Sequence, residues 1–169
     1  MKKVFLVVVV SICMGILTGC SGKTEKSGKS SVAENNSAIS LNELPGAVND
    51  FIALNYPSYK IKNAGHDPLC SGEDAMDVAI GKAGSPNFSL IFLPDGKFVQ
   101  QEEDVKLAAT PAKILNTVKT KYPGFTAENG AEKLTLADKK TVHYQLDLIK
   151  EGTSKEVIFD MEGNVVCEN

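Results

Sequence analysis

The sequence contains neither Arg nor Trp, and all eighteen positively charged side chains are Lys. Arg supplies the planar fork best suited to phosphate and carboxylate recognition, and Arg and Trp are two of the three residue types most common at binding hot spots. The formal net charge is −3 and the pI is about 5.4, so the chain also lacks the basic balance typical of nucleic-acid binding. We therefore expect no nucleic-acid partner.

Motifs that would indicate an enzyme or a metal site are also missing. His66 and His143 are the only histidines, and neither has a His four residues away or Cys neighbours at the spacing of a zinc site. In the acidic segment that begins at Asp67, Leu69 and Val78 occupy the third and twelfth positions, where a calcium-binding loop needs oxygen ligands. The chain has no Gly-x-Ser-x-Gly motif and no Gly-rich phosphate loop. We therefore expect no enzyme activity, no cofactor and no metal site, and we interpret both histidines as surface residues.

The first twenty residues differ in composition from the rest. Two lysines precede an almost wholly apolar run over residues 4–17, and the sequence Leu-Thr-Gly then stands immediately before Cys20. A positive start, a short apolar run and small residues are typical of a secretory signal, and the run is shorter than the roughly 20 residues that span a bilayer. The four residues that end at Cys20 resemble the lipobox of bacterial lipoproteins. The resemblance implies that residues 1–19 are removed and that Cys20 is lipidated; an ordinary signal peptide is the alternative.

Residues 20–40 are predicted to be a tether between the lipid and a folded domain. They are rich in Ser, Gly, Lys, Asn and Glu, and such a segment buries too little apolar surface to order itself. As a flexible coil it would hold the domain on the order of 25 Å from the membrane. Ser21 follows the lipidated Cys20 and, by similarity to sorted lipoproteins, implies an outer-membrane anchor that faces the periplasm. In a cell with one membrane, the domain would lie at the cell surface.

The remainder of the chain repeats itself at a nearly constant offset. Tyr56-Pro57 matches Tyr122-Pro123 at an offset of 66 residues, and Asp95-Gly96 matches Glu162-Gly163 at 67. Apolar residues between these points match at the same offsets. Two copies of one unit explain this regularity better than chance does. We place the copies at residues 41–102 and 103–169.

Each copy is predicted to begin with a helix that starts at a proline. Pro45 and Pro111 suit the first helical position, where the missing N–H costs nothing, and Thr110 is a residue type that caps helices. Both helices are predicted to end at Tyr-Pro, because proline disfavours a helical conformation in the residue before it. Apolar residues recur along each of these segments at helical spacing. They are Leu44, Val48, Phe51 and Ile52 in the first copy and Ile114, Leu115, Val118 and Tyr122 in the second.

The apolar period changes to two after each helix. Met76, Val78 and Ile80 alternate with other residues, as in half-buried antiparallel strands. Asp95-Gly96 and Glu162-Gly163 lie between apolar runs, which is a strong signal for a hairpin. We therefore predict an α+β fold of two repeats, each a helix followed by about four antiparallel strands, with the helices packed on one face of the sheet.

Several structural residues of the first copy together resemble those of a known family. They are Leu44-Pro45, Val48, Phe51-Ile52, Asn55-Tyr56-Pro57, Ile91-Phe92 and Asp95-Gly96-Lys97-Phe98. This set resembles the PepSY-like domain described as β-lactamase-inhibitor-like, and the resemblance extends over both copies. It implies a duplicated helix-plus-sheet unit in exported envelope proteins and supplies no catalytic residues. In the β-lactamase inhibitor protein an aromatic-rich concave sheet and a hairpin block the enzyme; this chain lacks Trp, so we do not expect inhibition of that enzyme class.

Cys70 and Cys167 are the thiols that remain besides Cys20, because Cys13 lies in the predicted signal segment. Export permits a disulfide, but a bridge requires the two Cα atoms to lie within about 7 Å. The sequence leaves two alternatives open, a bridge and two free thiols, with the free thiols marginally preferred. A bridge would join the two copies and stabilise the fold by about 4 kcal/mol.

Apolar residues on the second side of the predicted strands indicate a binding surface. Ile91, Leu93 and Ile158 alternate with the predicted core residues of their strands, so their side chains point to the opposite side. Exposed apolar patches mark interaction sites. The predicted binding residues are Ile91, Leu93, Val99, Ile158 and Val166, with the hairpin residues Asp95 and Gly96. The alternative is that loops, or the packing of one copy on the other, cover these residues.

These observations together predict a membrane-anchored envelope lipoprotein that binds an unidentified protein or peptide without catalysis. Inhibition of an envelope hydrolase is one form that this function could take. A small-molecule or ion-sensing module is the alternative, and a polar-lined pocket between the copies would favour it. A hydrolase with an unfamiliar site is a third reading, which clustered Asp, Glu and His side chains in one cleft would favour.

Overall fold

The computed structural model describes residues 37–169, and the predicted signal segment, the lipidation at Cys20 and most of the predicted tether lie outside these residues. The helical elements are α1 (Gly46–Asn55), η1 (Leu107–Ala109) and α2 (Ala112–Lys121). The strands are β1 (Lys60–His66), β2 (Met76–Gly81), β3 (Phe88–Phe92), β4 (Phe98–Lys106), β5 (Thr126–Ala127), β6 (Gly130–Leu136), β7 (Val142–Lys150), β8 (Thr153–Asp160) and β9 (Val165–Glu168).

All nine strands belong to one antiparallel sheet. The strand order is β1-β2-β3-β4-β6-β7-β8-β9, and β5 pairs with β7 beside this path. The two halves of the sheet are joined by β4 and β6, whose register runs from Gln100 opposite Leu136 to Lys106 opposite Gly130. This pairing satisfies backbone groups that two separate sheets would leave exposed at their edges.

The predicted fold class is therefore wrong. We predicted two helix-plus-strand repeats, whereas the described chain is a β-rich fold in which one continuous nine-stranded sheet carries only two α-helices. The period of two in the sequence reports which side of a strand is buried, and it carries no information about which strand lies next to it. The pairing of β4 with β6 was for this reason not visible in the sequence pattern.

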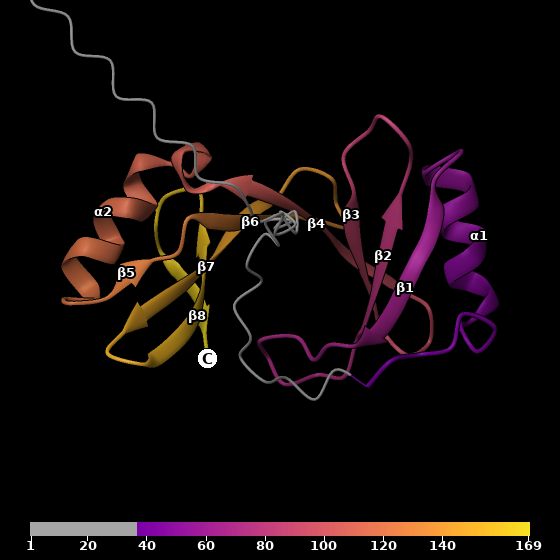
Figure 1. Ribbon diagram of the computed structural model, residues 1–169, viewed down its shortest axis with the longest axis horizontal. Helices are drawn as coiled ribbons and strands as arrows, with labels where there is room; N and C mark the ends of the chain where they lie inside the picture. The colour runs from indigo at the N-terminus through magenta and orange to yellow at the C-terminus, as the bar shows by residue number, and fades with distance from the viewer. Residues whose placement is uncertain (1–36) are drawn as a thin grey trace, which may run out of the picture. The chain divides into compact units, whose positions relative to one another are not determined.

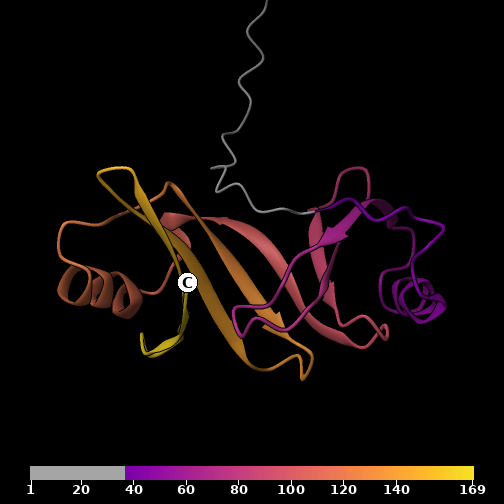
Figure 2. The same cartoon turned by 90° about the horizontal axis from the view of Figure 1, so that it is seen from below.

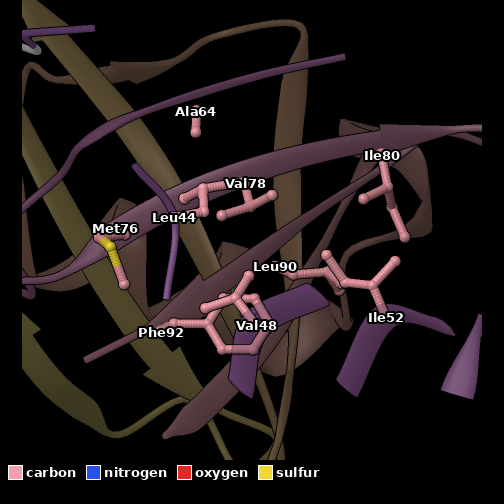
Figure 3. Close-up of a cluster of buried hydrophobic side chains, with 9 residues drawn as sticks. All are labelled: Leu44, Val48, Ile52, Ala64, Met76, Val78, Ile80, Leu90 and Phe92. Carbon is pink, nitrogen blue, oxygen red and sulfur yellow. The ribbon is translucent and has the colours of Figure 1, made fainter. Parts of the chain in front are cut away.

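The helices lie on one side of the sheet, at its two ends. Figure 1 shows β1 to β3 as one wall and β7 with β8 as another, joined by β4 and β6, with α1 and α2 outside the walls. Each helix buries one apolar stripe against the strands beside it. On α1, Val48 and Ile52 are buried against a cluster that includes Val78, Leu90 and Phe92 of the sheet (Figure 3). Burial of side chains of this size contributes about 1.5–3 kcal/mol each.

The second core is built from α2 and the strands β6 to β8. Ile114 and Val118 of the helix are buried with Tyr144, Leu146 and Phe159 of the sheet. The apolar residues of the two predicted helix faces thus occupy two separate cores, one under each helix. Because each core joins a helix to its own half of the sheet, neither core reaches the opposite side of the strands.

The helix ends agree closely between the two halves. Pro45 and Pro111 are the N-caps, with φ/ψ of −53°/139° and −53°/137°. Tyr56 and Tyr122 are the C-caps, with φ/ψ of −127°/62° and −118°/63°, and each donates its backbone N–H to the carbonyl oxygen four residues earlier. Thr110 does not cap α2 as we predicted: its side chain is buried, and its Oγ1 has no hydrogen-bond partner.

A tight hairpin packs against the first turn of each helix. Gly96 and Gly163 have φ of +86° and +85°, a conformation that favours glycine. A Cβ at Gly96 would lie 2.9 Å from that of Ala47, and a Cβ at Gly163 would lie 3.0 Å from the backbone of Lys113. The glycine in each turn is therefore required both by the backbone and by the neighbouring helix.

The disulfide Cys70–Cys167 joins the two ends of the sheet, with the Cα atoms 6.2 Å apart. Cys70 lies in the loop after β1, four residues beyond His66, and can be at most about 14 Å from it. In a flat sheet, β1 and β9 would lie about 34 Å apart, seven strand spacings. The sheet must therefore curl until its ends approach, and Figure 2 shows the β1–β2 loop reaching toward the C-terminus.

Candidate binding face

The predicted binding residues occupy different environments. Ile91 is 2% exposed and Val166 is 51% exposed. Gly96 is buried, Asp95 is exposed, and Leu93, Val99 and Ile158 are half-buried. Ile91 belongs to β3 and Ile158 to β8, and three strands lie between them. The structure therefore does not bring these side chains together in one exposed apolar patch.

The two predicted hairpin residues lie at the turn that packs against α1. The carboxylate of Asp95 accepts a hydrogen bond from the backbone N–H of Lys97 at 2.9 Å, and Gly96 adjoins Ala47 of the helix. These contacts shape the turn and hold it to the helix. Val99 and Val166 are the bulged residues beside the corresponding turns, because the ladder skips each of them.

The side of the sheet that faces away from the helices is a better defined surface, and we call it the inner face. Its residues follow from the strand register, in rows that cross the sheet. One row consists of Ala79, Ser89, Glu102, Leu134, His143 and Asp160. The next row consists of Asp104, Glu132, Gln145, Ile158 and Cys167. Since Cys167 belongs to this face, the disulfide closes the curled sheet across it.

Two apolar side chains of the inner face are buried without belonging to either helix core. Leu134 is 1% exposed and Ile91 is 2% exposed, and neither is part of the clusters under α1 and α2. Neither described helix covers the inner face, so the curl of the sheet and the groups around these side chains exclude water from them. They lie on β3 and β6, which are separated by β4, and in adjacent rows of the face.

A groove of about 180 Å³ lies on the inner face where the two halves of the sheet meet. Its lining residues are Ala79, Asn87, Phe88, Ser89, Glu102, Asp104 and Glu132. The Glu102 carboxylate accepts a hydrogen bond from the Gln100 side-chain amide at 2.8 Å. Burial, and next the charge of Glu132, raise the pKa of Glu102 well above its usual value. Asp77 and Asp67 act in the same direction.

A larger cavity, of about 340 Å³, lies at the other edge of the first half. Its lining residues are Ala38, Ile39, Glu43, Pro45, His66, Met76 and Pro94. The segment at Ala38 forms one β-bridge with Gly65 at the edge of β1. This cavity brings two ionisable side chains together, whereas the smaller groove gathers three carboxyl groups. The inner face therefore offers the more distinctive chemistry.

The two histidines lie apart from each other. His66 is exposed, with Nδ1 3.5 Å from a carboxylate oxygen of Asp74. His143 is half-buried on the inner face, opposite Leu134 on one side and Asp160 on the other. Within residues 37–169, no group of three or more His, Cys, Asp or Glu side chains is arranged to hold a metal ion.

We did not predict the acidic inner face from the sequence, because we considered only on which side of each strand the apolar residues lie. A signal was present, because Glu102 and Asp104 alternate on one side of β4 and Glu132 belongs to the neighbouring β6. Alternation alone would not have placed these carboxyl groups together. Their proximity depends on the pairing of β4 with β6, which the sequence pattern did not reveal.

Neither described helix is long and apolar enough to cross a membrane. No family model matches the chain, and comparison with curated proteins finds no relative. Solved structures do match. A protein from Bacteroides eggerthii, described as periplasmic, aligns with a TM-score of 0.54 at 15% identity, covering 74% of this chain and 87% of its own. A DUF2874 family protein from Bacteroides uniformis aligns with a TM-score of 0.53 at 14% identity, covering 74% and 88%.

A third similar structure is a BLIP-like protein from Bacteroides fragilis, with a TM-score of 0.51 and 14% identity over 74% of this chain and 84% of its own. This chain has the fold of the DUF2874 and BLIP-like proteins. At these identities the similarity establishes the shared fold and no more.

Proposed function

We propose that this protein is a non-catalytic binding protein of the bacterial cell envelope and that it holds a protein or peptide on its inner face. The observation that carries the proposal is the inner face itself, a curled sheet surface that neither described helix covers. The disulfide Cys70–Cys167 holds the β1–β2 loop across it. A preorganised concave surface lowers the entropy cost of binding, because little of it needs to order when a partner arrives.

The location and the anchor belong to the same proposal. The apolar N-terminal run and the lipobox-like sequence before Cys20 support export and lipidation, with the anchor in the outer membrane and the domain facing the periplasm. One protein of similar fold is described as periplasmic, which supports the same compartment. The replacement Cys20→Ser tests the anchor: we expect the variant to leave the membrane fraction, and retention there would contradict lipidation.

Inhibition of an envelope hydrolase is the specific form of binding that we favour. The sequence resemblance to the PepSY-like, β-lactamase-inhibitor-like domain supports it, and one protein of similar fold is described as BLIP-like. The groups that we assign to recognition are the inner-face residues and the β1–β2 loop. The hairpin at Asp95, whose Gly96 packs against Ala47 of α1, is not among the groups that we assign to recognition.

Photo-crosslinking in living cells tests the binding face directly. A photoreactive amino acid is introduced at Gln145, on the inner face, and in a matched variant at Asn116, which is exposed on α2. We expect the Gln145 variant to form a covalent adduct with one envelope protein and the Asn116 variant to form none. Adducts from Asn116 alone, or from neither position, would contradict the proposal.

A small-molecule or ion-sensing function is the second candidate. The groove between the halves of the sheet is lined by Ser89, Asn87 and three carboxyl groups, and such a polar pocket is what this function requires. Its volume of about 180 Å³ is below the roughly 300–1,000 Å³ typical of small-molecule sites. The size of the groove therefore favours a partner that lies across the whole face over one enclosed within it.

A further inference from the structure

The inner face is strongly biased toward negative charge. Seven carboxyl side chains share it by strand register: Asp77, Glu102, Asp104, Glu132, Asp147, Glu156 and Asp160. The same register places Lys106 and Lys60 there, and the side chain of Lys62 reaches Gly81 at one edge. Among the described strands, the face thus carries seven carboxyl groups against three lysines and His143.

The β1–β2 loop adds to the same charge. This loop carries Asp67, Glu73 and Asp74 and has no Lys, and the bridge from Cys70 to Cys167 holds it across the inner face. Two hydrogen bonds within the loop extend the β1–β2 ladder. The backbone N–H of Asp67 donates to the Ala75 carbonyl at 2.9 Å, and that of Leu69 donates to the Glu73 carbonyl at 2.8 Å. The acidic loop is therefore held in place beside the acidic strands.

The ionised form of Glu102 is disfavoured by burial and by the neighbouring carboxyl groups. Its carboxylate lines the groove, its hydrogen bond comes from the neutral Gln100 amide, and none of the ion pairs of the described residues includes it. Burying a carboxylate without a counter-charge is costly. A cation that enters the groove would relieve this cost, so the groove has more to gain from a positive ligand than an exposed acidic surface would.

The spacing of the carboxyl groups suits an extended polypeptide. Glu102 and Asp104 are two residues apart on β4, so they lie about 6.8 Å apart along the strand. Alternate side chains of an extended peptide repeat at the same distance.

We propose that the inner face binds a cationic polypeptide segment of a partner protein, with Lys or Arg at alternate positions in an extended conformation. This inference rests on the proposed function and adds the chemistry of the partner to it. Charge complementarity of this kind speeds association and selects among partners. The complex should therefore weaken as the salt concentration rises.

Fluorescence anisotropy of a labelled ten-residue peptide with Lys at alternate positions tests the inference on the purified full chain. We expect saturable binding to the wild-type protein and about tenfold weaker binding to the double variant Asp104→Asn, Glu132→Gln. The matched control is Asp50→Asn, Glu151→Gln, which changes the net charge equally at exposed positions on α1 and in the β7–β8 turn. We expect that control to bind like the wild type.

Equal weakening in both double variants, or no saturable binding at low salt, would overturn the inference. If the inner-face variant fails to fold, the salt dependence of wild-type binding is the test of the inference. An affinity for the peptide that does not change with salt concentration would also overturn the inference. The outcome is separable from that of the proposed function. If Gln145 forms a crosslinked adduct but the protein has no affinity for the basic peptide, the hypothesis of a cationic partner is wrong. The proposal that the inner face binds a partner would then still hold.

Discussion

The disulfide offers the sharpest quantitative test of how the two ends of the sheet are held together. Cys70 and Cys167 are 97 residues apart in the sequence, and closing a loop of that length lowers the entropy of the unfolded chain. The chain-entropy model makes this worth about 4.7 kcal/mol at 25 °C. The described domain has 133 residues, for which an unfolding entropy of about 0.28 kcal/mol/K is expected. The variant Cys70→Ser, Cys167→Ser should then melt about 17 °C below the oxidised protein.

Urea denaturation followed by circular dichroism measures this loss. We expect a lower midpoint and a larger m-value in the double Ser variant, because its unfolded chain is freer and exposes more surface. Reduced wild-type protein is the control, since it retains both thiols and loses only the covalent constraint. If the oxidised, reduced and double Ser proteins all unfolded at the same midpoint, the bridge would not constrain the chain and the argument from loop length would be refuted.

Three further substitutions test individual positions. Thr110→Val should raise the free energy of unfolding by about 1 kcal/mol in urea denaturation, because a buried hydroxyl without a partner is removed; a loss would show that the hydroxyl is satisfied. Glu102→Gln should stabilise the protein at pH 7 but much less at pH 4. The pKa of Glu102 is raised in the folded protein, so the folded state binds the proton more tightly than the unfolded state does. The stability of the wild type therefore falls as the pH rises from the pKa of Glu102 in the unfolded chain to its pKa in the folded protein. Equal effects at both pH values would contradict this. Gly163→Ala should cost about 1–2 kcal/mol more than Gly72→Ala in thermal melts, since both have positive φ but only the first would press a Cβ against Lys113; equal losses would refute the packing argument.

The position of the helices could be predicted from the sequence because their signals are local. α1 and α2 begin immediately after Pro45 and Pro111 and end immediately before Tyr56 and Tyr122, since the conformational limits of proline act on adjacent residues. The buried parity of the strands is local in the same sense, because alternate side chains point to opposite sides of a strand whatever its neighbours are. Asp95-Gly96 likewise marks its own turn.

The candidate site lay beyond such reasoning. Ile91 was predicted to be exposed because its parity is opposite to that of the core, yet it is 2% exposed since the sheet curls over its second side. The predicted binding residues were chosen one strand at a time. The acidic groove, in contrast, requires Glu102 on β4 to lie beside Glu132 on β6, and that neighbourhood depends on strand order.

The helix limits, the strand residues buried beneath the helices and the turns could be read from the amino-acid sequence, because neighbouring residues impose these features through sterics and side-chain alternation. The pairing of β4 with β6, the meeting of Cys70 with Cys167 and the gathering of seven carboxyl groups on one curled face became apparent only in the folded chain. Those features join residues that are far apart in the chain, and hydrogen bonding between strands is made by backbone groups that every residue carries. Residue identity therefore leaves the choice of partner strand open until the whole sheet forms.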